Sequence, residues 1–222
     1  MSRAEIVRII PALVTASVVA CSSATSHRGG ADPTSTERGI ARARADSARL
    51  PYTAADIHFM SGMISHHAQA IVMAKWAPTH GAGASVIRLT ERVVNAQTDE
   101  IPMMQGWLRD RRQPVPEADP KGLKMMMNGV EHVMPMPGML SDAQMQELDA
   151  ARGLEFDRLF LTFMIQHHRG AVAMVQELFS HRGAAQDETV FRFASDVNVD
   201  QTTEINRMAE MLLALGSPAR DR

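Results

Sequence analysis

The sequence of 222 residues contains one cysteine, one tyrosine and two tryptophans, and aromatic side chains make up only 5% of it. A single cysteine cannot form an intramolecular disulfide, so the fold must hold together without that cross-link. Runs of β-branched residues are scarce, whereas alanine, leucine, methionine, glutamine and glutamate are common, which favours helices over strands. The formal net charge of −2 argues against nucleic acid as a partner.

The N-terminal apolar run, Ile9 to Ala20, is shorter than the ~20 residues that a membrane-spanning helix needs. It follows a short basic start with Arg3 and Arg8, a pattern typical of a secretory signal peptide. The run leads into Cys21 within Val-Val-Ala-Cys-Ser, which resembles the lipobox of bacterial lipoproteins, where the cysteine carries the lipid. We predict a lipoprotein signal peptide at residues 1–20 and lipidation of Cys21; an ordinary leader with an incidental cysteine is the alternative.

Composition divides the rest of the chain. Residues 21–50 are rich in Ser, Thr, Gly, Ala and Arg and carry almost no large apolar side chains, so they are predicted to form a disordered tether. Residues 51–222 are long enough for one domain with its own core. Within that domain we distinguish repeat one (53–112), a Met-rich crossover (113–140) and repeat two (141–216).

One motif occurs twice, 101 residues apart and without a gap. It runs from Asp56 to Met73 and again from Asp157 to Met174, with the Asp, Phe, Met, Ile, His-His, Ala and final Met positions in common. Each copy is followed by a matching segment, Gln97-Thr-Asp-Glu100-Ile and Gln201-Thr-Thr-Glu204-Ile. Because an internal repeat fixes the architecture, we predict an all-α, ferritin-like four-helix bundle made of two helical hairpins joined by a long crossover.

Helix-start and helix-stop signals place the four helices. Capping boxes are predicted at Thr53 with Asp56 and at Ser141 with Gln144, and Pro102 is expected to kink the second helix. The expected ranges are 53–77, 85–111, 141–181 with a bend at Gly153, and 187–215. In the first helix the repeated residues share one face, which should be buried because the opposite face carries Ser61, Ser65, Gln69 and Lys75.

A buried helix face with two imidazoles is unusual, because each buried polar group without a partner costs ~1 to 3 kcal/mol. One such histidine is usually hydrogen-bonded core, but two His-His pairs at equivalent places favour a metal site. Thioether and imidazole together suit Cu(I) and Ag(I). The first candidate ligands are Met63, His66, Met73, Met164, His167 and Met174, followed by His67 and His168. Adjacent histidines point about 100° apart, so one of each pair is expected to support the site or bridge to another helix.

A second set of repeated polar residues is expected around these ligands: Asp56, Gln97, Glu100, Asp157, Gln201 and Glu204. For the glutamates and glutamines, hydrogen bonding and direct ligation are equally open, whereas the two aspartates lie at helix starts, which favour carboxylates in any case. His58, His80, His132 and His181 are interpreted as unmatched solvent-side or loop residues. The crossover methionines lie among Gly and Pro residues and are predicted to form an accessory loading segment outside the core: Met125, Met126, Met127, Met134, Met136 and Met139.

The double motif, together with Met136-Pro-Gly-Met139-Leu-Ser, resembles the bacterial family catalogued as domain of unknown function 305. The resemblance covers about residues 55–215. It implies a ferritin-like bundle in exported proteins, some of which bind copper or silver in metal resistance, and it implies no enzymatic activity. Two asymmetries, Leu161 opposite Met60 and Pro102 in only one partner helix, mean that the half-sites need not bind alike.

The sequence therefore predicts a lipid-anchored metal-binding protein of the cell envelope, periplasmic or on the outer face of a membrane. It would sequester or deliver Cu(I), or silver, and its partners would be the ion, the membrane and a copper-handling protein. One alternative is a structural bundle with hydrogen-bonded core histidines. The other is a dimetal oxidase, which is disfavoured because such sites use Glu-x-x-His and no Glu in the chain is followed by His at that spacing.

Overall fold

The computed structural model describes residues 34–47 and 51–216, so the predicted signal peptide and Cys21 lie outside the described residues. No described helix is both long and apolar enough to cross a membrane. The helices are α1 (Ser35–Ser47), α2 (Ala54–Trp76), α3 (Ala84–Asp110), α4 (Asp142–Ala150), α5 (Gly153–Ser180) and α6 (Glu188–Gly216), and the strands are β1 (Leu123–Met127) and β2 (Val130–Met134).

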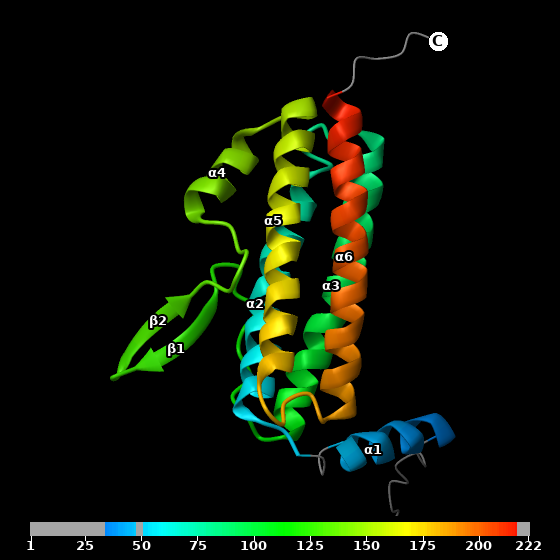
Figure 1. The fold of residues 1–222 in the computed structure, drawn as a ribbon, viewed down its shortest axis with the longest axis vertical. Coiled ribbons are helices and arrows are strands. Elements are labelled where there is room, and N and C mark those ends of the chain that lie inside the picture. Colours follow the sequence, from blue (N-terminus) through cyan, green and yellow to red (C-terminus); the bar gives the residue numbers. More distant parts are fainter. Residues whose placement is uncertain (1–33, 48–50, 217–222) are drawn as a thin grey trace, which may run out of the picture.

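Helices α2, α3, α5 and α6 form the predicted four-helix bundle, in which α2 pairs with α3 and α5 pairs with α6 (Figure 1). Helix α2 also packs against α5, and this contact joins the two repeats. The core consists of two apolar clusters. The first contains Phe59, Met63 and Met174, and the second contains Met73, Phe160 and Met164. The paired histidines lie along α2 and α5 between these two clusters.

Both predicted capping boxes are present, at Thr53 with Asp56 and at Ser141 with Gln144. The third predicted helix, however, is not one bent helix. Ala151 and Arg152 adopt extended conformations and separate α4 from α5. Gly153 then has a φ of 57° and donates its N–H to the carbonyl of His80 at 2.8 Å. This N–H therefore makes no hydrogen bond that would continue α4 into α5.

The prediction of a tether without secondary structure is wrong for Ser35–Ser47, which form α1. Thr34 and Glu37 cap its start reciprocally, because the Glu37 side chain accepts the Thr34 N–H and the Thr34 hydroxyl accepts the Glu37 N–H. The side chains of residues 34–42 are exposed, and the helix contains good helix formers such as Ala and Arg in addition to its cap.

The crossover contains a β-hairpin that was not predicted. Strands β1 and β2 pair antiparallel, from Leu123 opposite Met134 to Met127 opposite Val130. Asn128 and Gly129 form the turn with φ values of 53° and 79°, the conformation for which Asn-Gly is the preferred sequence. Figure 1 shows that the hairpin projects away from the bundle.

The expectation that all six crossover methionines lie outside the core is wrong for two of them. Met136 and Met139 are 4% and 8% exposed and belong to the first apolar cluster, whereas the other four are exposed on the hairpin. The reason is the turn at Pro137 and Gly138, which lies directly on the backbone of α5. A Cβ atom on Gly170 would collide with the Pro137 carbonyl, and Gly138 itself has a φ of 79°.

The same packing corrects the prediction for the outer face of α2. Ser61, Ser65 and Gln69 are buried rather than solvent-facing, because the crossover covers them. The Gln69 amide donates to the carbonyls of Pro120 and Leu140, each at 3.0 Å, and its oxygen accepts the Leu140 N–H at 2.6 Å. Helix α2 is therefore buried on nearly all sides along its middle.

Candidate metal centre

Four histidines, two from α2 and two from α5, form a fully buried polar layer in the middle of the bundle: His66, His67, His167 and His168. We call them the histidine layer. The rings of His66 and His167 meet across the contact between the two repeats, with centroids 3.7 Å apart. The repeated His-His pairs are thus brought together in one place, as the repeat predicts.

The outer member of each pair binds a glutamate on the neighbouring helix. His67 Nε2 lies 2.7 Å from Glu100 Oε2 on α3, and His168 Nε2 lies 2.7 Å from Glu204 Oε2 on α6. Of the two roles that the sequence leaves open for these glutamates, the structure shows the hydrogen-bonding one. A carboxylate in this position fixes the ring and its tautomer, as it does behind many metal-binding histidines.

These contacts decide which imidazole nitrogens keep a lone pair. His66 Nε2 lies 3.1 Å from the carbonyl of Pro137, and a carbonyl can only accept, so Nε2 carries the proton. Glu100 and Glu204 likewise accept from Nε2 of His67 and His168. The Nδ1 atoms of these three rings therefore carry lone pairs. All are buried, and within the described residues none has a hydrogen-bond partner; the same holds for both nitrogens of His167.

Burial keeps the inner imidazoles neutral. Burial first, and then the nearby His67 and His168, lower the pKa of His66 to about 3, while the Pro137 carbonyl opposes the shift. The pKa of His167 also lies well below its usual value. Burial is the main cause, and the neighbouring imidazoles add to it. A neutral ring is the form that can donate a lone pair to a metal.

The predicted methionines lie above and below this layer. Because α2 and α5 run antiparallel, Met63 shares a cluster with Met174 and Met73 shares the other cluster with Met164. All four are buried. Each of the two clusters beside the histidine layer thus contains at least one thioether from each repeat.

The remaining predicted polar residues divide into two groups. Gln97 and Gln201 are buried beside Glu100 and Glu204 along a groove of about 310 Å³ between α3 and α6, and their Oε1 atoms have no partner among the described residues. Asp56 and Asp157 instead lie at the two ends of the bundle, ~15 Å along the helix from the histidines. Asp56 accepts the Ala185 N–H at 2.7 Å and Asp157 accepts the Gly83 N–H at 3.1 Å.

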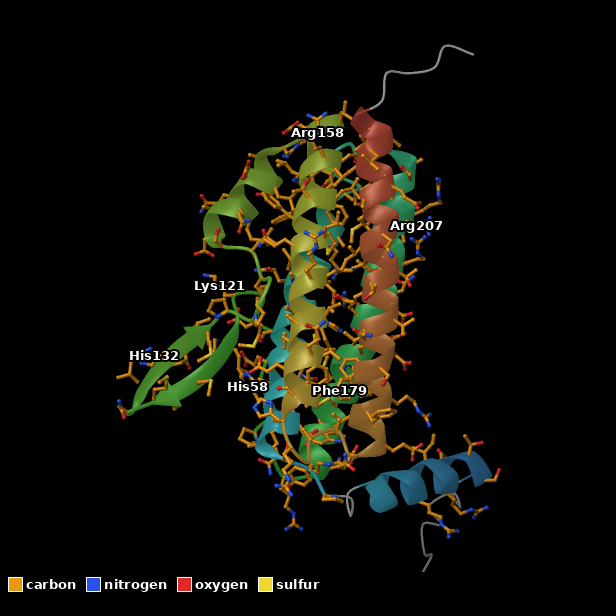
Figure 2. All side chains as sticks on the ribbon, in the orientation of Figure 1. His58, Lys121, His132, Arg158, Phe179 and Arg207 are labelled. Atoms are coloured by element: carbon orange, nitrogen blue, oxygen red, sulfur yellow. The ribbon has the colours of Figure 1, made fainter. Side chains whose placement is uncertain are left out.

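The other histidines do not join the layer. His58 and His132 lie on the outside of α2 and on the hairpin (Figure 2). His80 and His181, interpreted from the sequence as unmatched, are in fact related by the same 101-residue spacing as the motif. His80 is buried, whereas His181 is exposed. In the part of the chain that the structure describes, no three His, Cys, Asp or Glu side chains are grouped closely enough to hold one metal ion.

The sequence and the fold are both similar to those of known proteins. The chain matches the model of the family described as "Domain of unknown function (DUF305)" over residues 56–212. A DUF305 protein from Streptomyces coelicolor is 30% identical with a TM-score of 0.61, covering 76% of this chain and 98% of its own. A DUF305 fragment from Deinococcus radiodurans is 28% identical with a TM-score of 0.60, covering 74% and 99%.

A third structural match is CopM in its Cu(II)-bound form, which is 25% identical with a TM-score of 0.55 and covers 72% of this chain and 96% of its own. CopM has also been solved in Cu(I)-bound and Ag-bound forms. No curated protein sequence matches the chain.

Proposed function

The chain belongs to the DUF305 family, and on that premise we propose that it binds Cu(I) or Ag(I) in its histidine layer, as an exported, lipid-anchored protein of the cell envelope. It holds the ion for sequestration or for delivery to a copper-handling partner, with no catalytic step. The Streptomyces and CopM structures support the fold, and CopM supports copper and silver as the cargo.

The observation that carries the proposal is the set of buried lone pairs. The Nδ1 atoms of His66, His67 and His168 are unprotonated, and none of them accepts a hydrogen bond from the described residues. A buried acceptor without a partner costs about 1 to 3 kcal/mol. A bound ligand that accepts these lone pairs would remove that cost. A cation satisfies several such atoms at once, whereas a hydrogen-bonded structural core would leave them unused.

The ligand types favour a soft monovalent ion. Imidazole and thioether are the donors nearest the centre, and these select Cu(I) over hard divalent ions. Since no three His or acidic side chains are grouped in the described residues, the ion would be held by fewer imidazoles, with the flanking methionines as additional ligands. The carboxylates that a dimetal oxidase would use, Glu100 and Glu204, are instead bonded to imidazoles.

Replacing the histidine layer tests this proposal. The quadruple alanine variant of His66, His67, His167 and His168 should lose tight Cu(I) binding in competition with a chelator. The single variant His167→Leu is the gentler form, because His167 has no described hydrogen bond that the change would break. It should weaken binding while the far-UV CD spectrum stays helical.

The control is His132→Ala, on the exposed hairpin, which should bind as the unchanged protein does. Unchanged affinity in both layer variants would show that the histidines are structural core and that the chain is a helical bundle without a metal.

The lipid anchor has its own test. Cys21→Ala should move the mature protein from the membrane fraction to the soluble fraction, because no other acyl-accepting cysteine exists in the sequence. Equal membrane retention of the two forms would disprove the anchor and leave metal binding unaffected.

A further inference from the structure

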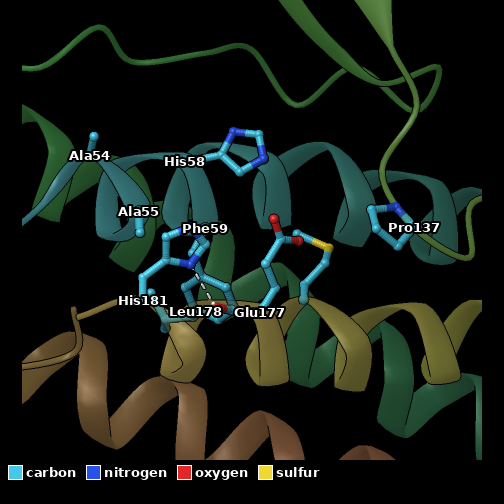
Figure 3. Close-up of a pocket in the computed structure, with 9 residues that line it drawn as sticks. Ala54, Ala55, His58, Phe59, Pro137, Glu177, Leu178 and His181 are labelled. Carbon is cyan, nitrogen blue, oxygen red and sulfur yellow. Dashed lines mark hydrogen bonds between the residues drawn. The ribbon is translucent and has the colours of Figure 1, made fainter. Parts of the chain in front are cut away.

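A pocket of about 280 Å³ opens at one end of the bundle, between the first turns of α2 and the last turns of α5. His58 from α2 and Glu177 and His181 from α5 lie on its two sides, and Pro137 of the crossover closes one end (Figure 3). All three of the polar side chains are exposed, whereas the floor contains the buried thioether of Met174. The pocket therefore combines solvent-accessible nitrogen and oxygen donors with a sulfur beneath them.

One of these donors is already oriented to bind a cation. His181 Nδ1 lies 2.8 Å from the backbone carbonyl of Glu177, and the carbonyl can only accept, so Nδ1 carries the proton. The lone pair is then on Nε2, the nitrogen that faces away from the backbone. A hydrogen bond from the other ring nitrogen to a carbonyl is the usual way in which proteins fix a metal-binding imidazole.

The floor of the pocket connects to the histidine layer through two residues. Met174 Cε and Met136 Sδ both crowd the space in front of Gly62, so these two methionines lie together at one point of α2. Met136 precedes Pro137, whose carbonyl accepts the hydrogen bond from His66. A soft ion that leaves the pocket inward would thus meet thioethers first and the imidazoles of the histidine layer next.

The opposite end of the bundle lacks this arrangement, although the repeat supplies equivalent positions. Leu159 and Trp76 stand where the pocket has His58 and Glu177. His80, equivalent to His181, is buried, and its two nitrogens lie 3.0 Å from Thr79 Oγ1 and from Asp149 of α4. The position equivalent to His181 is therefore closed, and the positions equivalent to His58 and Glu177 carry no imidazole or carboxylate.

We propose that this pocket is the loading site, where Cu(I) or Ag(I) first binds before it moves to the histidine layer. The inference rests on the proposed function and adds the entry point to it. The three polar side chains are not grouped closely enough to hold an ion together, so one or two of them bind it along with water. Such binding is weak and exchangeable, as a site that passes its ion inward requires.

The test compares rates of loading with affinity at equilibrium. The variant H58A/E177Q/H181A changes only exposed side chains, and Cu(I) is delivered anaerobically from a chelator complex in a stopped-flow experiment. We expect the loading rate to fall at least tenfold while the final affinity and stoichiometry stay within twofold. The matched control is E131Q/H132A on the hairpin, and a second comparison replaces the four exposed hairpin methionines by leucine, namely Met125, Met126, Met127 and Met134.

Each outcome decides between the possibilities. If the unchanged protein binds no Cu(I), the proposed function itself fails. Tight binding with equal loading rates in the pocket variant overturns the loading site alone, as does slow loading in the hairpin variant only. Loss of affinity together with rate in the pocket variant would show that these residues belong to the final site rather than to an entrance.

Discussion

At the scale of single residues, the histidine layer is defined by which nitrogen of each ring carries the proton. The Pro137 carbonyl and the two glutamates each accept a hydrogen bond from a protonated Nε2, and this leaves the lone pair for a metal on Nδ1. Burial then keeps the His66 and His167 rings neutral. The His66 ring is thus neutral and oriented before the ion arrives, which reduces the cost of binding because it needs neither deprotonation nor rotation.

The neutral imidazoles make a prediction about the stability of the metal-free protein. In the unfolded chain a histidine gains a proton near pH 6.5, whereas His66 in the folded protein has a pKa of about 3. The unfolded state therefore binds more protons between these values, and the free energy of unfolding should fall as the pH falls through this window. The limiting slope is about 1.4 kcal/mol per pH unit for each of His66 and His167.

Urea unfolding at pH 7.5, 6.0 and 5.0 measures this loss above the range in which most carboxylates titrate. His167→Leu removes one of the two groups and should flatten the slope. An equal slope in the variant would mean that other groups cause the acid sensitivity.

At the scale of elements, the turn at Pro137 and Gly138 determines how the crossover closes over the histidine layer. It supplies the carbonyl that fixes His66, and it can approach α5 only because residue 170 is glycine. Gly170→Ala should destabilise the protein by about 1 to 3 kcal/mol, since the colliding atom is backbone and cannot turn aside. Thermal unfolding checks this.

Gly106→Ala in α3 is the matched control. Nothing lies within 4 Å of its added Cβ, so this change should be neutral or stabilise the helix by up to about 1 kcal/mol. Equal effects of the two substitutions would show that the turn does not rest on α5 in solution.

The elements also show how far the sequence predicts this fold. Helix ends follow from local signals, so the caps at Thr53 and Ser141 and the bundle itself could be predicted. The hairpin was not predicted, although Asn128-Gly129 is the preferred sequence for its turn. Burial of Met136 could not be predicted, since it depends on contacts with Gly62, which lies far away in the sequence.

The candidate site likewise has some features that the sequence predicts and others that it does not. The repeat brings the His-His pairs together, and its symmetry identified the glutamate partners. The sequence could not tell which nitrogens are left without a partner, because the Pro137 carbonyl, which accepts the hydrogen bond from His66 Nε2, approaches from the crossover. Nor could it show that Asp56 and Asp157 bind the Ala185 and Gly83 amides, because these loop residues lie far away in the sequence.

At the scale of the whole molecule, the two repeats are tied at both ends as well as in the middle. Asp56 of repeat one holds the loop after α5, and Asp157 of repeat two holds the loop after α2, so the ties are reciprocal. The symmetry is incomplete. Helix α4 contacts the end that contains His80, whereas the pocket opens at the opposite end.

The two ties are equivalent in sequence but should differ in strength. Asp56 is fully buried and accepts three hydrogen bonds, from the Thr53 N–H and hydroxyl at 2.6 and 2.7 Å and from the Ala185 N–H at 2.7 Å. Asp157 accepts only the Gly83 N–H among its described contacts, shared between both oxygens at 3.1 Å, and burial raises the pKa of Asp157.

Asp56→Asn should therefore cost about 2 to 3 kcal/mol, because the amide group turns one acceptor into a donor that faces other donors. Asp157→Asn should cost about 1 kcal/mol or less, since a single amide oxygen can still accept the Gly83 N–H and no buried charge remains. Urea unfolding of the two variants at pH 7.5 measures the difference. Equal losses would mean that the repeated carboxylates act alike and that the extra hydrogen bonds of Asp56 add nothing to the union of the two repeats.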